Sequence, residues 1–201
     1  MWALIEDGSI TKHLSGNRGI TIGDVRHSRK IFSLWSKSEL EAIGIYEIVF
    51  NNTNKKDEAY YINTNQSFAF ADGVVTASYG SATAKAHADT TWTQADSDDG
   101  LLPSDKSVGD VKVEGLKTIK ITNVKKQAAG ILAETDWYIV RKADAGTAVP
   151  SAVTTYRAAV RTKSGEMETL IDACSTVDEL AALYIRNVDG VRPLGEFPEA
   201  V

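Results

Sequence analysis

The sequence predicts an α+β protein with a small β-rich N-terminal domain followed by a mainly helical C-terminal region. Three stretches of different character support this prediction. Residues 1–80 contain short apolar runs separated by turns rich in Asn, Asp and Gly, a pattern typical of strands. Residues 81–113 are dominated by Ala, Thr, Ser, Asp and Gly, as expected of a linker or extended insert. In residues 114–186 the apolar positions recur near helical spacing.

The first element is predicted to be a β-hairpin. Trp2–Ile5 and Ile10–Leu14 flank the dipeptide Asp7-Gly8, and Asp-Gly between two apolar runs is the strongest short hairpin signal. The run Ile20–Ile22 can add a further short strand.

A short helix is expected next. The apolar cluster Ile31–Trp35 precedes Ser36, and Glu39 follows Ser36 at the spacing of a capping box, so the sequence predicts a helix over 37–43 that stops at Gly44. Residues 45–50, 59–63 and 74–79 favour strands. The predicted core consists of Trp2, Leu4, Ile22, Phe32, Leu34, Leu40 and Ile45, and Trp35 is expected to join it.

Helices dominate the second half. The spacing predicts one long helix over 114–134, and Thr135-Asp136 offers an N-cap for a shorter helix that Gly146 ends. Pro150 and Ser151 open another helix, and a separate short turn of helix is expected over 167–173. Thr176 and Glu179 then form a second capping box.

The last segment, residues 187–201, is predicted to be an irregular tail. Pro193, Gly195 and Pro198 prevent a regular element there. Leu194 and Phe197 are the large apolar residues that could anchor this tail on a neighbour.

Composition excludes several classes of function. The formal net charge is −5, which disfavours a nucleic-acid-binding role, because neutralising phosphates requires clustered Lys and Arg. Cys174 is the single cysteine, so no internal disulfide can form and the chain can mature in a reducing cytoplasm. No stretch approaches the ~18 uninterrupted apolar residues of a membrane span, and the N-terminal residues lack the apolar run of a signal peptide. Membrane insertion and secretion by a signal peptide are therefore not expected.

No motif indicates catalysis or a cofactor. His13, His27 and His87 lie on separate segments without a second ligand at helical spacing, so no metal site is expected. The acidic stretch 96–100 lacks the ligand pattern of a calcium loop and is predicted to be a solvated loop. Cys174 is expected to be a packed, inert thiol. Glu166 and Glu168, two apart on a helix, point away from each other and are expected to face solvent.

Two passages resemble the tail-fibre assembly and accessory proteins of tailed bacteriophages. They cover the first fifty residues and about 116–184, whereas the insert 82–110 is longer than that pattern. The first comprises Gly19-Ile20-Thr21-Ile22-Gly23-Asp24-Val25, Ile31-Phe32-Ser33-Leu34-Trp35-Ser36 and Ala42-Ile43-Gly44-Ile45-Tyr46-Glu47. The second comprises Leu132-Ala133-Glu134-Thr135-Asp136-Trp137, Pro150, Tyr156-Arg157 and Arg161.

This resemblance implies a non-catalytic virion protein of the phage tail, made in the host cytoplasm. It would link or support tail fibres by contacts with a tail-fibre or baseplate protein, and could form a homo-oligomer within a symmetric tail. One alternative is an assembly chaperone that is absent from the mature particle. Others are a host-directed regulatory binder and an enzyme that degrades surface polysaccharide, which would need a pair of carboxylates about 5 to 9 Å apart.

Partner-contact candidates are chosen by their chemistry. An aromatic ring in the polar insert makes Trp92 the first candidate. Arg157 and Arg161 lie four apart on one helical face, where they either receive acidic groups of a partner or are simply solvated. Trp137 is expected to bury its ring against Tyr156 and Leu132. The full set of partner-binding candidates is Trp92, Arg157, Arg161, Leu194 and Phe197.

Overall fold

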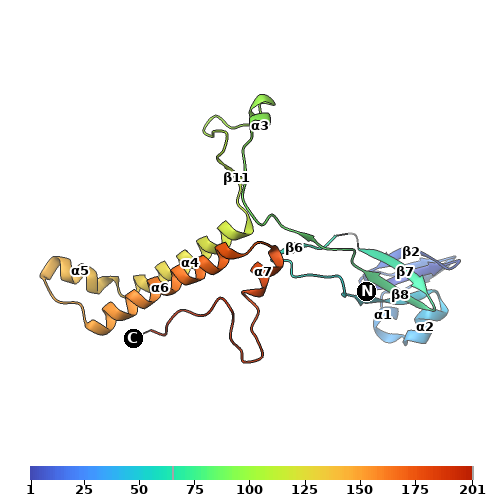
Figure 1. The fold of residues 1–201 in the computed structure, drawn as a ribbon. Coiled ribbons are helices and arrows are strands. Elements are labelled where there is room, and N and C mark those ends of the chain that lie inside the picture. Colours follow the sequence, from blue (N-terminus) through green and yellow to red (C-terminus); the bar gives the residue numbers. More distant parts are fainter. Residues whose placement is uncertain (65, 201) are drawn as a thin grey trace. The chain divides into compact units, whose positions relative to one another are not determined.

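The computed structural model describes residues 1–64 and 66–200 and divides into two compact units, Met1–Thr83 and Ala84–Val201. The first unit is built on strands and the second on helices, so the predicted α+β class is confirmed. Figure 1 shows the two kinds of structure along the chain. No described helix is both long enough and apolar enough to cross a bilayer.

A five-stranded sheet in the order β2-β1-β5-β8-β7 forms the centre of the first unit. Neighbouring strands are antiparallel except β5 and β8, which pair in parallel. The sheet curls, because the ring of His13 on one edge strand lies 4.1 Å from the ring of Phe68 on the other. Its strands are β1 (Trp2–Glu6), β2 (Ser9–Leu14), β5 (Ile45–Asn51), β7 (Ser67–Ala71) and β8 (Val74–Ser78).

Two hairpins of this sheet turn at Asp-Gly pairs. Asp7 and Gly8 have φ of 51° and 75°, and Asp72 and Gly73 have 51° and 74°. Positive φ at both turn residues matches the right-handed twist of the flanking strands. The predicted first hairpin is thereby confirmed, whereas β7 of the second was missed, although its alternating sequence leads into the same turn signal.

Short elements complete the first unit. The capping box of α2 is confirmed, since Glu39 N–H donates to Ser36 Oγ over 3.3 Å and Ser36 N–H donates to Glu39 Oε2 over 2.7 Å. Gly44 ends this segment at φ +80°, and a Cβ there would lie 2.6 Å from the carbonyl oxygen of Ile5. The short elements are β3 (Ile20–Ile22), β4 (Val25–His27), α1 (Ile31–Leu34), α2 (Lys37–Ala42) and β6 (Tyr61–Ile62), and β9 (Thr83–Ala84) spans the boundary at which the second unit begins.

The two faces of the sheet bury different clusters. One face packs Leu4 and Ile45 under α1 and α2, and the other packs Ala3 and Val75. The prediction that Leu34 belongs to the core is wrong, because its side chain is 74% exposed. Helix α1 has a single turn, and its buried side is taken by Ile31 and Phe32. Trp35 is also more exposed than predicted, with its ring 5.7 Å from that of His27.

Two long helices form the centre of the second unit. Helices α4 (Leu116–Ala133) and α6 (Ser151–Ala173) pack along each other. They run in opposite directions, since Lys117 at the start of α4 pairs with Asp172 at the end of α6, Nζ to Oδ1 over 3.1 Å. The predicted helix over 114–134 is confirmed. The predicted break before 167 is wrong: Ser164 and Met167 continue the buried side of α6, and one glycine, Gly165, does not interrupt it.

Five further elements belong to the second unit. Helix α5 joins α4 to α6 and ends at Gly146 with φ +69°, as predicted. The capping box of α7 is also confirmed, with Glu179 N–H donating to Thr176 Oγ1 over 3.2 Å. The segment expected as a linker or extended insert carries regular structure. The elements are β10 (Thr90–Thr91), α3 (Gln94–Asp98), β11 (Val111–Val113), α5 (Asp136–Ala145) and α7 (Val177–Ala182).

Candidate protein-binding surface

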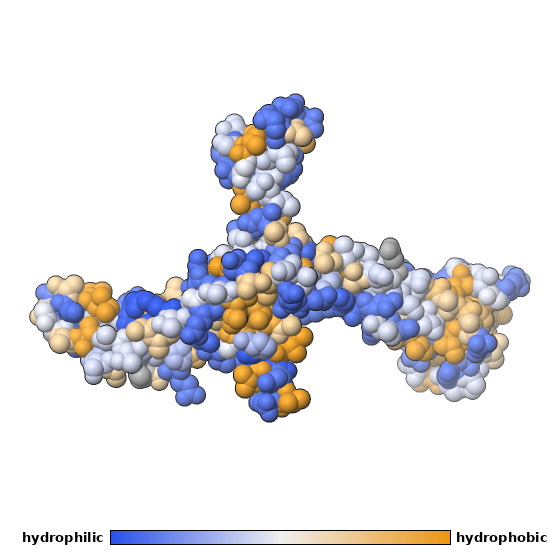
Figure 2. Space-filling model, viewed as in Figure 1, coloured by the Kyte–Doolittle hydropathy of each residue, from blue (hydrophilic) through white to orange (hydrophobic). Residues whose placement is uncertain are grey.

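Helix α5 displays large apolar side chains that its own unit does not cover. Trp137, Ile139 and Val140 are 50%, 43% and 65% exposed, and no residue of α5 is buried. Hydrophobic residues accordingly appear on the surface around this helix in Figure 2. Clustered exposed apolar side chains with polar neighbours are characteristic of protein interaction sites.

The aromatic residues of α5 are held in a stack with an arginine. The ring centroids of Trp137 and Tyr138 lie 3.7 Å apart with planes at 31°. The Arg141 guanidinium lies 4.7 Å from the Trp137 centroid and 5.5 Å from that of Tyr138. Among the residues that the structure describes, Arg141 Nε is buried without a hydrogen-bond acceptor. We call Trp137, Tyr138, Ile139, Val140 and Arg141 the α5 surface.

The prediction for Trp137 is therefore wrong. Its ring does not bury against Tyr156 and Leu132, since half of the side chain is exposed and its neighbours are Tyr138 and Arg141. Tyr156 is instead buried with Ala128 in the hairpin of α4 and α6. The available signal was that apolar residues at 137, 139 and 140 do not lie on a single stripe of one helix, so they cannot all face one core.

Arg157 fastens the start of α5 to α6. Its guanidinium donates hydrogen bonds to the carbonyl oxygen of Leu132 over 2.7 Å and to Thr135 Oγ1 over 2.6 Å, and its Nη2 lies 2.8 Å from Asp136 Oδ1. Arg157 is only 7% exposed. The structure thus gives it an internal role in place of the expected contact with a partner.

The predicted start of α5 is right, but its predicted cap is not. Thr135 is the N-cap residue without a capping side-chain hydrogen bond. Its hydroxyl instead donates to the carbonyl oxygen of Leu132 over 3.0 Å and accepts from Arg157. The hydroxyl of Thr135 thus bonds to Arg157, 22 residues away, and does not cap the helix. The sequence around Thr135 gives no sign of this long-range bond.

The tail candidates also pack within the chain. Leu194 is buried, and its N–H donates to the carbonyl oxygen of Leu183 over 3.0 Å. Phe197 packs against the cluster of Ala128, Tyr156 and Val160. These two residues anchor the tail on their own unit and not on a partner. Arg161 has an exposed side chain that donates to the carbonyl oxygen of Arg157 over 3.3 Å, so it stays open to a partner.

Trp92 belongs to a projecting hairpin, 89–114, which we call the stalk and which carries α3 at its free end (Figure 1). The main chain of Trp92 donates to Asp110 O over 2.9 Å and accepts from Gly109 N–H over 2.8 Å. The Lys112 Nζ lies 4.4 Å from its ring centroid. Trp92 is half-buried under this lysine, and the structure does not bring it together with the α5 surface.

The acidic stretch 96–100 is not a loop, because it largely belongs to α3. Thr93 and Asp96 form its capping box, with Asp in the place that Glu usually takes. The spacing of a capping box was present in the sequence, but the usual pattern has Glu or Gln at the third helical position and not Asp. Lys112 Nζ also contacts Asp96 Oδ1 at 2.5 Å.

Asp96 supplies a prediction of pH dependence. Hydrogen bonds from Lys112 and from Thr93 lower the pKa of Asp96 to about 2 from its ordinary value of 3.8. A carboxyl whose pKa is depressed on folding stabilises the stalk above its unfolded pKa and loses that effect as the pH falls through the folded pKa. Carboxyl ¹³C NMR should show the Asp96 midpoint near 2, rising toward 3.8 in Lys112→Met. An unchanged midpoint in that variant would contradict the assigned contact.

The remaining candidate reactive side chains, Cys174, Glu166 and Glu168, are either buried or paired with lysines. Cys174 is buried, as expected, and burial, followed by the nearby Glu179 carboxylate, raises the pKa of its thiol. Glu166 pairs with Lys163, and Glu168 pairs with Lys125. Within 1–64 and 66–200, no three His, Cys, Asp or Glu side chains gather as metal ligands would.

Comparison with protein-family models, with curated proteins and with solved structures finds no match to this chain. The structure itself shows an α+β protein of two units, in which helix α5 exposes the ring of Trp137. The resemblance to phage tail proteins rests on the two sequence passages alone.

Proposed function

We propose that this chain is a non-catalytic component of a bacteriophage tail that links or supports tail fibres through protein–protein contacts of the α5 surface. The observation that carries the proposal is the exposure of Trp137, Ile139 and Val140 on one short helix, where Trp137 stacks on the half-buried Tyr138 and Arg141. Trp, Tyr and Arg are the residues most enriched among energetically dominant interface positions.

The position of this surface in the chain also supports the proposal. The second passage that resembles tail-fibre accessory proteins begins with residues 132–137, which lead directly into the α5 surface. Arg157 and Arg161, which belong to the same passage, lie on α6 behind the start of α5. The proposed partner is a tail-fibre or baseplate protein, with the virion tail as the site of action.

The first experiment counts the chain in gradient-purified particles of the encoding phage, by quantitative mass spectrometry against the major tail protein. A fixed copy number in particles is the expected result. Abundance in infected-cell lysate with none in particles would overturn the virion role and establish the alternative, an assembly chaperone that leaves before maturation. Absence from particles together with binding to a host protein would indicate a host-directed binder.

The second experiment tests the surface itself. Trp137→Ala should weaken binding to the purified fibre or baseplate protein at least about tenfold, because truncating a central aromatic anchor costs ~2 kcal/mol or more, and ~1.4 kcal/mol already corresponds to a factor of ten. Val140→Asp should lower the affinity more than Trp137→Ala does, because binding would remove the new carboxylate from water. The matched control is Val108→Asp in the stalk, where the native valine is 47% exposed. Equal binding by Val140→Asp and Val108→Asp would contradict the assignment to α5.

A further inference from the structure

The first unit contains a basic segment of chain, which the proposed function does not use. Residues 9–38 contain six Lys and Arg residues against one acidic residue, in a chain of net charge −5. The basic residues are Lys12, Arg18, Arg26, Arg29, Lys30 and Lys37, and the acidic one is Asp24.

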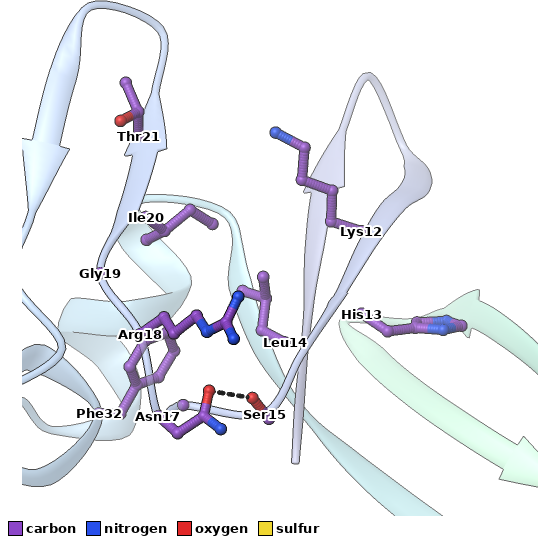
Figure 3. A pocket seen from close by; sticks show the side chains of 11 residues that line it. Lys12, His13, Leu14, Ser15, Asn17, Arg18, Gly19, Ile20, Thr21 and Phe32 are labelled. Atoms are coloured by element: carbon purple, nitrogen blue, oxygen red, sulfur yellow. Dashed lines mark hydrogen bonds between the residues drawn. The ribbon is translucent and has the colours of Figure 1, made fainter.

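Two hollows of the first unit share the loop that follows β2, residues 15–17, in their linings. One hollow, of about 440 Å³, includes Lys12 and Arg18 in its lining, and Figure 3 shows the side chain of Lys12 on β2 and that of Arg18 on the loop before β3. The other, also about 440 Å³, includes Arg29 and Lys30. No acidic residue lines either hollow. We call these four residues the basic socket.

The socket is available for a negatively charged partner. All four side chains are exposed, and none of them forms an ion pair with another residue in the described part of the chain. The half-buried ring of Phe32 lines both hollows. A fitting ligand therefore combines carboxylates with an apolar side chain.

The stalk of the second unit has that chemistry at its free end. Asp98 and Asp99 are exposed at the end of α3, and Leu101, two residues further on, is 60% exposed. Gly100 between them has φ +71°, which turns the chain sharply. Across 93–110 five acidic residues oppose one lysine: Asp96, Asp98, Asp99, Asp105 and Asp110 against Lys106. We call residues 98–101 the acidic tip.

We propose that the acidic tip of one copy docks in the basic socket of a second copy, so that the chain self-associates head to tail. Asp98 and Asp99 then meet Lys12, Arg18, Arg29 and Lys30, and Leu101 packs on Phe32. The contact joins two different surfaces, so a pair of copies has one free tip and one free socket. Further copies can therefore add at either end, until an open chain or a closed ring results. Exposed ion pairs make such an interface strongly dependent on salt.

The test follows mass by sedimentation velocity at about 50 mM and about 500 mM NaCl, where screening lengths differ severalfold. The wild type should exceed the monomer mass of 21.8 kDa at low salt and return to it at high salt. Lys12→Glu/Arg18→Glu, which destroys the socket, should stay monomeric at low salt. Asp98→Lys/Asp99→Lys, which destroys the tip, should behave alike.

Mixing the two variants distinguishes this geometry from general charge attraction. The first keeps a native tip and the second a native socket, and the two reversed surfaces are also complementary in charge, so the mixture should regain the association that neither variant shows alone. The matched control, Lys55→Glu/Lys56→Glu, changes the charge of the same unit equally and should associate as the wild type does. A wild type that is monomeric at low salt, a mixture that stays monomeric, or a control that fails to associate would each overturn the proposal. This test is independent of fibre binding through α5.

Discussion

Replacing Arg157 by alanine is expected to lower the free energy of unfolding by about 2–4 kcal/mol, because a hydrogen bond that involves a charged group contributes ~1.5–3 kcal/mol. The buried guanidinium donates such bonds to the carbonyl oxygen of Leu132 and to the hydroxyl of Thr135, which in the variant keep only the bond between themselves. The Asp136 side chain is 57% exposed, so water screens its ion pair and that pair adds little. Urea unfolding followed by far-UV circular dichroism measures the change.

Arg161 provides the matched control for this prediction. It lies one turn further along the same helix with an exposed side chain. Arg161→Ala should therefore change the free energy of unfolding by no more than about 0.5 kcal/mol, as is usual for surface substitutions. Equal losses in the two variants would show that Arg157 does not have the structural role assigned to it.

Ile45→Ala is expected to destabilise the first unit by about 2–5 kcal/mol, the usual cost of truncating a buried aliphatic side chain and leaving a cavity. Ile45 is fully buried at the start of β5, in one cluster with Leu4 of β1 and Leu40 of α2. Its loss therefore weakens contacts among three elements. Urea unfolding monitored by amide NMR signals of the first unit measures the effect.

Val49 is the control on the same strand, since its side chain is 54% exposed. Val49→Ala removes a β-branched residue from β5 without opening a cavity, and its cost should stay within about 1 kcal/mol, the span of strand propensities. A loss for Ile45→Ala no larger than that for Val49→Ala would contradict the packing assigned to this face of the sheet.

Local signals in the sequence were sufficient for several elements. The first hairpin follows from Asp7-Gly8, where both residues adopt positive φ. Helices α2 and α7 follow from capping boxes that bond groups three residues apart. The long helix α4 follows from the spacing of its apolar residues. In each case the decisive interaction lies within a few residues along the chain.

Signals that vary in form were overlooked. The Thr93–Asp96 capping box uses Asp where Glu is usual, so α3 was missed. The alternation in β7 before Asp72-Gly73 was missed for a similar reason, although the turn repeats the chemistry of the first hairpin. These two elements were predictable in principle.

Other features depend on residues far apart in the chain. The parallel pairing of β5 with β8 places Ile48 opposite Val75. No local sequence pattern specifies this pairing. Leu34 points outward because Ile31 and Phe32 occupy the buried side of a one-turn helix. The pairing of β5 with β8 is thus fixed by residues distant in sequence, and the exposure of Leu34 by the side of α1 that the rest of the unit covers.

The candidate site divides in the same way. Sequence alone determined the α+β class, the order of strands before helices, and the bounds of α5 from Asp136 to its end at Gly146, because turns, caps and helical spacing act over a few residues. Whether an arginine or a tryptophan of that region faces a partner depended on tertiary packing. Arg157 is held inside by hydrogen bonds to backbone and hydroxyl groups more than twenty residues away, whereas Tyr156 is buried in the helical hairpin and Trp137 stays half exposed.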